Sequence, residues 1–104
     1  MVETRWPELG GKQLRYSDHT WELTGMVDVR GTGETLAVEA TQVDDVRHGK
    51  AILRFGLENP PASLNPGDLG DHFDKLEREG DRYHVVVKKE PRIYRYELQG
   101  IEHQ

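Results

Sequence analysis

Apolar and polar residues alternate along most of this chain, which is the pattern of strands that bury one face. In the stretch 20–29 the apolar residues Trp21, Leu23 and Val27 fall on odd positions, spaced by even steps. The same alternation recurs at 13–16, 36–40 and 51–57, with turn-forming residues between the stretches. The pattern predicts four successive antiparallel strands between residues 12 and 57, with a β-bulge or bend between Thr41 and Asp45 where the period slips.

The next part of the chain changes character. Three prolines interrupt residues 58–67, which have no hydrophobic period and therefore predict a connecting loop. In the following stretch 68–79, Leu69, Phe73 and Leu76 are spaced by four and three residues. Asp68 is a residue suited to cap a helix, and Gly80 is suited to end one. The spacing predicts one amphipathic helix over residues 68–79, packed against the sheet.

Alternation returns at 82–99 and predicts a final hairpin. Tyr83, Val85 and Val87 share one face, while the apolar Val86 lies on the other, which indicates a sheet covered on both faces or a barrel. The expected fold is therefore α+β, with a six-stranded antiparallel sheet that is strongly curved or partly closed, in the order β-β-β-β-α-β-β. Residues 1–11 are expected to form an N-terminal arm and residues 12–104 a single α+β domain.

Composition limits the classes of function. The chain has 104 residues, a formal charge of −5 and no cysteine. A chain of this length forms one domain, and the lack of cysteine excludes disulfides, iron–sulfur clusters and thiolate zinc sites. No apolar run approaches the roughly 18 residues of a membrane span, and the N-terminus lacks the apolar core of a secretory signal. We therefore expect a cytoplasmic protein without a cofactor and without membrane contact.

Charge is distributed unevenly along the chain. Residues 82–95 contain five basic residues and one acid, which gives this hairpin a formal charge of +4 against −9 for the remainder. Sheets that bind single-stranded nucleic acid combine such cations with exposed aromatic rings. The candidate binding residues are therefore the basic and tyrosine side chains of the hairpin: Arg82, Lys88, Lys89, Arg92, Arg95, Tyr94 and Tyr96. The alternative is a charge-paired surface hairpin whose tyrosines face the core, because Tyr94 and Tyr96 share a face with Leu98.

The sequence provides no catalytic or metal-binding motif that we can assign. None of the five histidines lies three to five residues from another, as two ligands on one helix face would. Asp44, Asp45 and His48 lie together and could hold a metal or transfer a proton. Because aspartate and a His-Gly pair are ordinary turn-forming residues, we interpret this cluster as structural and assign no catalytic and no metal site.

The function that these observations favour is a non-catalytic binding or protein-interaction module. A homodimer is one form of it, joined through sheet edges or through the basic hairpin and the acidic remainder. One alternative is single-stranded nucleic-acid binding through residues 82–95. Another is a small-ligand carrier or enzyme with a cavity between sheet and helix, under the 58–67 loop.

Overall fold

The alternating segments form one antiparallel sheet. The computed structural model describes residues 2–31, 33–44, 49–57, 73–89 and 92–103, and every statement about structure below refers to these ranges. Most of the described residues lie in eight strands and one short 3-10 helix: β1 (Val2–Arg5), η1 (Pro7–Leu9), β2 (Gln13–Tyr16), β3 (His19–Arg30), β4 (Thr35–Gln42), β5 (Lys50–Leu57), β6 (Phe73–Glu79), β7 (Arg82–Lys89) and β8 (Arg92–His103). The predicted meander of four strands and the predicted C-terminal hairpin are confirmed.

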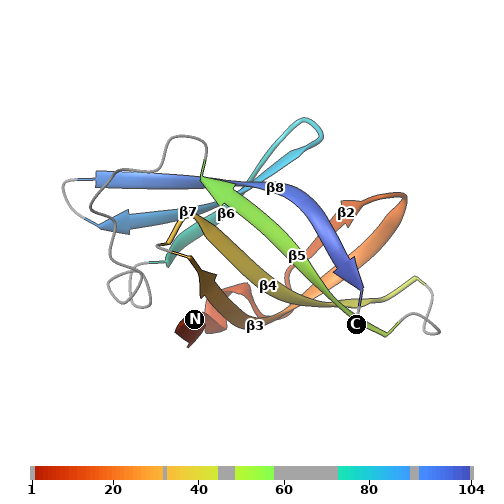
Figure 1. Ribbon diagram of the computed structural model, residues 1–104. Coiled ribbons are helices and arrows are strands. Elements are labelled where there is room, and N and C mark those ends of the chain that lie inside the picture. Colours follow the sequence, from red (N-terminus) through yellow and green to blue (C-terminus); the bar gives the residue numbers. More distant parts are fainter. Residues whose placement is uncertain (1, 32, 45–48, 58–72, 90–91, 104) are drawn as a thin grey trace.

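The eight strands occupy seven positions across the sheet, in the order β1-β3-β4-β5-β8-β7-β6. Strand β4 pairs with one side of β3, so the other side of β3 holds both β1 and β2, one on each half of its length. Strand β8 is long and curved in Figure 1; its first half pairs with β7 and its second half with β5. The sheet thus connects the N-terminal meander to the β6–β7 hairpin through β8.

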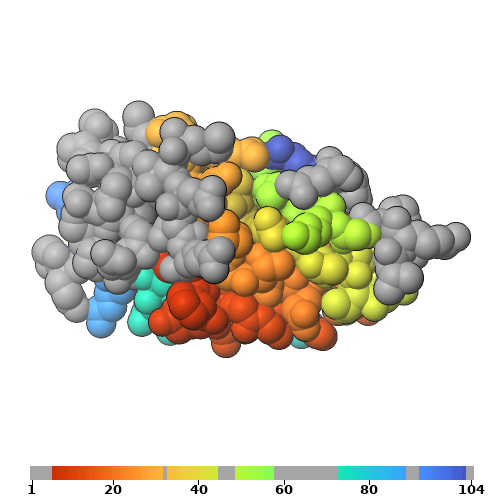
Figure 2. Space-filling view, turned by 90° about the horizontal axis from the view of Figure 1, so that it is seen from below, coloured from red at the N-terminus to blue at the C-terminus, as the bar shows by residue number. Residues whose placement is uncertain are grey.

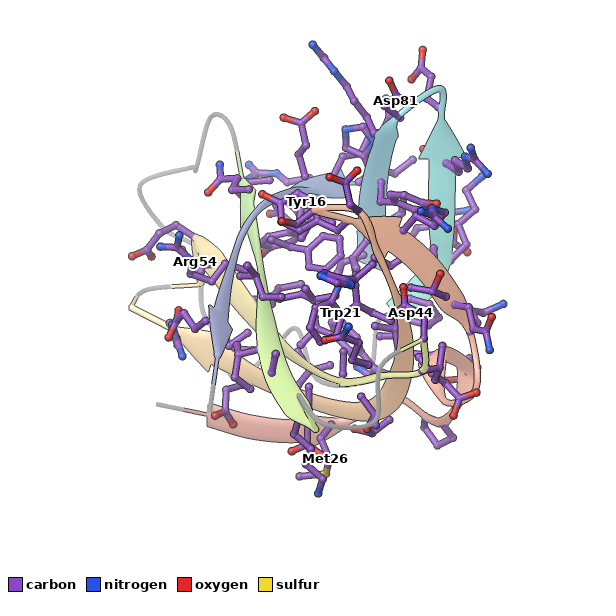
Figure 3. The ribbon with its side chains drawn as sticks, turned by 90° about the vertical axis from the view of Figure 1, so that its right-hand side faces the viewer. Tyr16, Trp21, Met26, Asp44, Arg54 and Asp81 are labelled. Carbon is purple, nitrogen blue, oxygen red and sulfur yellow. The ribbon has the colours of Figure 1, made fainter. Side chains whose placement is uncertain are left out.

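The sheet curls into a half-barrel around a single core. Figure 3 shows Trp21 inside the curl and Arg54 on its outer side. The largest fully buried side chains include Trp21, Phe55 and Tyr96, which come from β3, β5 and β8 and fill the interior. Val86, on the opposite face of β7, is also buried. The curl brings the two outermost parts of the sheet toward each other.

The expected α+β fold is wrong. Phe73–Glu79 forms strand β6, not the second half of a helix, and the described residues contain no α-helix and eight strands instead of six. The register with β7 explains the misleading spacing. Phe73 pairs with Val87 and Leu76 with Val85, because a bulge adds one residue to β6 between them. Two residues three positions apart therefore lie on one face of a strand, as they would on a helix. Residues 68–72, including Leu69, lie outside the described ranges.

The sequence predicted a bulge or bend between Thr41 and Asp45, whereas the register shift that the structure describes lies in β3. Strand β4 continues to Gln42, whereas the register between β3 and β4 shifts between Leu23 and Val27; Asp45 lies outside the described ranges. At this shift Gly25 has a φ of +94°, a conformation that glycine adopts without steric cost. Its carbonyl accepts a hydrogen bond from the backbone N–H of Trp6 (2.8 Å). The bulge therefore fixes the N-terminal segment on the edge of the sheet.

Trp6 joins the beginning of the chain to β6. Its side chain is buried and its ring stacks on Phe73, with 5.2 Å between the ring centroids. In Figure 2 the residues at the start of the chain (red) lie against β6 (teal), in agreement with the contact between η1 and β6. This stack closes one end of the gap between the two outermost parts of the sheet.

We expect Trp6→Ala to reduce the free energy of unfolding by about 3–5 kcal/mol, because it removes a buried aromatic side chain and leaves a cavity. Chemical denaturation followed by far-UV circular dichroism measures this change. The matched control is Ile93→Ala, since Ile93 is 60% exposed and its loss should cost within about 0.5 kcal/mol. Equal stability of Trp6→Ala and wild type would contradict the anchoring role of Trp6.

Candidate functional site

Among the described strands, β1, β2 and β6 each have an outer side without a neighbouring strand, because β1 and β2 pair only with β3 and β6 only with β7. The outer sides of β2 and β6 line the same gap. We call the gap between β2 and the β6–β7 hairpin the seam. An unpaired edge presents backbone N–H and C=O groups that another strand can bind.

The β2–β3 turn determines which backbone groups of β2 point into the seam. Ser17 and Asp18 have φ values of 54° and 64°, the left-handed conformation that a two-residue type I′ hairpin requires. The flanking pair Tyr16 and His19 is therefore hydrogen-bonded, and the pattern alternates along the strand. It follows that the backbone groups of Gln13 and Arg15 point away from β3 and into the seam.

The β6–β7 turn determines the outward groups of β6 in the same way. Gly80 has a φ of +61° and occupies the first position of a two-residue turn, as in type II′ hairpins. Glu79 and Arg82 flank this turn, so Glu79 and, two residues earlier, Glu77 bond to β7. The backbone groups of Leu76 and Arg78 consequently point away from β7 and toward the free edge.

Side chains bridge the seam where a backbone ladder is missing. The backbone N–H of Arg15 donates to the hydroxyl oxygen of Tyr83, at 3.3 Å and across 68 residues of sequence. The guanidinium of Arg78 lies over the ring of Tyr83, 5.8 Å from its centroid. Tyr83 is buried and belongs to the core. Tyr83 therefore connects β7 to the exposed edge of β2.

Two hollows of about 360 and 300 Å³ lie along the seam and share Arg78 and Tyr83. The lining comes from β2 and its turn on one side and from the β6–β7 hairpin on the other: residues 15–18, Arg78, Asp81 and Tyr83 for the larger hollow, and Lys12, Gln13, residues 76–78 and Tyr83 for the smaller one. In Figure 3, Tyr16 and Asp81 lie near each other at the same end of the molecule. The seam is thus a groove whose walls carry both signs of charge.

Two cations of the basic hairpin are paired with acids on β6 and β8. Arg95 on β8 contacts Glu77 on β6 at 2.6 Å and Glu79 at 3.8 Å. Arg82 contacts Glu97 at 3.6 Å. The Glu77 carboxylate accepts a hydrogen bond from Arg95, which holds its pKa below the ordinary value in spite of partial desolvation. Acids from β6 and β8 thus lie beside two of the cations that the sequence suggested for phosphate binding.

The other hairpin candidates divide between surface and core. Lys88 and Arg92 are exposed, while the side chain of Lys89 lies outside the described parts. Tyr94 is partly buried against the core. Tyr96 is fully buried, and its hydroxyl donates a 2.7 Å hydrogen bond to the carbonyl of Gly33. Burial raises the pKa of Tyr96 well above its ordinary value. The ring of Tyr96 is therefore not available for stacking at the surface.

A polar cluster lies at the end of β4. The side-chain amide of Gln42, which is buried, donates to Asp44 at 3.0 Å and is 2.8 Å from His19 Nδ1. Asp44 also accepts a hydrogen bond from the backbone N–H of Thr20. Although partial desolvation acts in the opposite direction, the hydrogen bonds from Gln42 and Thr20 lower the pKa of Asp44. These contacts attach the end of β4 to the β2–β3 hairpin.

This cluster differs from the one considered in the sequence. Asp44 contacts His19, whereas Asp45 and His48 lie outside the described ranges. Within the described part of the chain, no three histidine or carboxylate side chains gather closely enough to hold a metal ion. No helix among those residues is long and apolar enough to cross a membrane. The seam is therefore the candidate site that the geometry offers.

Sequence analysis did not find the seam because its residues come from two distant segments. Arg15 and Arg78 belong to no local motif. Because residues 68–79 were assigned to a helix, the free strand edge of β6 was not predicted. The two-residue turn at Gly80 was the available signal, since glycine between two alternating stretches is typical of a hairpin.

We expect Arg95→Ala to raise the pKa of Glu77 toward its ordinary value of about 4.3, because the guanidinium that stabilises the carboxylate is lost. A carboxylate with a lowered pKa stabilises the fold above its unfolded pKa, and this contribution is lost as pH falls through the folded pKa. The variant should therefore lose less stability than wild type between neutral and acidic pH. Carboxyl-detected NMR titration measures the pKa, with Arg92→Ala as control; an unchanged Glu77 titration would contradict the pairing.

Comparison of this chain with protein-family models, with curated proteins and with solved structures finds no match in any of the three. The function must accordingly be inferred from the geometry of the seam.

Proposed function

We propose that this protein is a non-catalytic protein-interaction module that binds an extended polypeptide strand in the seam. The observation that carries the proposal is the pair of unpaired sheet edges, β2 and β6, which line one groove and are bridged by side chains. A strand that enters this groove gains backbone hydrogen bonds from an exposed edge, as in strand addition to other sheets.

The outward backbone groups supply the affinity for such a strand. Gln13 on β2 and Leu76 and Arg78 on β6 direct their N–H and C=O groups away from their own ladders. The N–H of Arg15 is bonded to the hydroxyl of Tyr83, and the 3.3 Å length of that bond is at the long end of the range. An incoming carbonyl could replace this hydroxyl at little cost.

The charges of the groove favour a polypeptide of mixed charge over a nucleic acid. Lys12, Arg15 and Arg78 line it together with Asp18 and Asp81. A phosphate backbone would gain from the cations but would be repelled by the two aspartates. A polypeptide strand can place opposite charges against both groups.

The interior and the groove both support binding at the surface without catalysis. Trp21, Phe55 and Tyr96 fill the inside of the half-barrel, and the described residues contain no helix that could form a cavity with the sheet. Ser17 is the hydroxyl nucleophile nearest to the groove, and the described lining includes no histidine to activate it. The proposal therefore assigns no catalytic residue.

The proposal predicts that a bound polypeptide is lost when a strand edge is blocked. In Gln13→Pro and Leu76→Pro the missing N–H is one that points into the seam, so the ladders to β3 and β7 remain. We expect polypeptides from a cell extract of the source organism, or added untagged copies of this chain, to be captured by tagged wild type. At least one proline variant should capture them about tenfold less, as judged by quantitative mass spectrometry.

The matched control is Arg92→Ala, which changes an exposed residue of β8 outside the groove and should capture as much as wild type. Thermal unfolding verifies that each proline variant is folded. Equal capture by wild type and by both folded proline variants would contradict binding in the seam.

A further inference from the structure

We propose that the strand bound in the seam is β6 of a second copy of this chain, paired antiparallel with β6 about a two-fold axis that passes beside Leu76. This inference rests on the proposed function, because it names the partner of the same edge. It is drawn from the backbone alternation of β6, the order of its charges and the exposure of its side chains.

The backbone of β6 permits such a pair. Leu76 directs both its N–H and its C=O toward the free edge, since its neighbours Lys75 and Glu77 bond to β7. When two copies meet antiparallel with Leu76 opposite Leu76, each residue donates to the other and forms a closed hydrogen-bonded pair. Lys75 of each copy then stands opposite Glu77 of the other.

The residues on either side of Leu76 carry opposite charges. One residue away lie Lys75 and Glu77, whereas Asp74, two residues away, is the extra residue of the bulge. In the antiparallel pair every Lys75 stands opposite a Glu77. Lys75 and Glu77 already share one face of the strand, 3.4 Å apart, so the cross-strand pairs form on that face. Opposite charges directly across from each other stabilise a strand pair.

Other registers place like charges together. A shift that centres the axis on Glu77 brings Glu77 opposite its own copy, and a shift to Lys75 does the same for lysine. Centring on Arg78 opposes two arginines. Like charges directly opposite destabilise a strand pair, so among the registers centred on residues 74–79 only the one centred on Leu76 avoids such repulsion at the axis. A single register is therefore specified.

The exposure of β6 agrees with this role. Asp74, Lys75 and Arg78 are exposed, and Leu76 is only partly buried. The edge of β2 is a weaker candidate, because the Arg15 N–H already bonds to Tyr83 within the chain. Charged residues on an edge often serve to prevent association. In β6, however, Lys75 and Glu77 can pair with Glu77 and Lys75 of a second copy, so these charges favour association with that copy.

The proposal is tested by sedimentation velocity over a concentration series of the full chain. Wild type should form a dimer, and Leu76→Pro should be monomeric, since the proline removes the N–H at the axis without removing a bond to β7. Lys75→Glu places two glutamates opposite each other on both sides of the axis and should weaken dimerisation by about tenfold or more. The exchange variant Lys75→Glu with Glu77→Lys restores opposite charges and should recover the dimer.

Arg92→Asp is the control, because it reverses a charge on β8 away from the edge and should leave the dimer intact. Lys75 is exposed and its ion pair is with Glu77 on its own strand, so Lys75→Glu should fold normally, as thermal unfolding of each variant verifies. Raising the salt concentration should weaken the wild-type dimer and leave the Leu76→Pro monomer unchanged.

A wild type that stays monomeric at millimolar concentration would overturn the inference, as would a dimer that persists in Leu76→Pro. A dimer lost in Lys75→Glu and not recovered by the exchange variant would also contradict the register. These failures are distinct from failure of the proposed function. If wild type is monomeric but captures another polypeptide, and the edge variants lose that polypeptide, the homodimer is contradicted. The proposed strand-binding function is then supported.

Discussion

The curl of the sheet is completed by side chains and not by a backbone ladder, and the rest of the structure depends on this constraint. Trp6 stacks on Phe73 at one end of the gap, and the Tyr83 hydroxyl accepts the N–H of Arg15 further along. These contacts bring β2 and β6 together, and of the outward backbone groups of β2 they engage the N–H of Arg15. The molecule therefore combines a closed core with two edges that retain the capacity to bind a strand.

The N-terminal segment determines where the gap lies. Because β1 and β2 share one side of β3, the chain must leave the sheet between them, and η1 occupies that interval. The carbonyl of Gly25, at the bulge, accepts a hydrogen bond from the backbone N–H of Trp6. This bond places the Trp6 side chain against β6. The basic hairpin faces the other surface, where Arg95 holds Glu77. The position of β6, which contacts Trp6, β7 and Arg95, thus determines the packing, the groove and the charge pairing.

The sequence predicted the individual strands but not their lateral arrangement. Clean alternation identified the stretches around Trp21 and Phe55, because one face of each is buried in the core. It failed at β6, where a bulge gives Phe73 and Leu76 the three-residue spacing of a helix. The seam was not predictable from local pattern either, since Arg15 and Tyr83 meet across 68 residues. Charge patterning located the basic hairpin but could not show that Arg95 is neutralised by Glu77.

Hydrogen exchange at the Arg15 amide tests most directly whether a side chain, and not a neighbouring strand, closes the seam. The measurement compares wild type with Tyr83→Phe by NMR, using Leu14 as the internal reference because its N–H bonds to β3. The account predicts that loss of the hydroxyl accelerates exchange at Arg15 to the rate at Gln13, while Leu14 keeps its protection. Unchanged protection of Arg15 would show that a backbone acceptor holds this edge and would contradict the account.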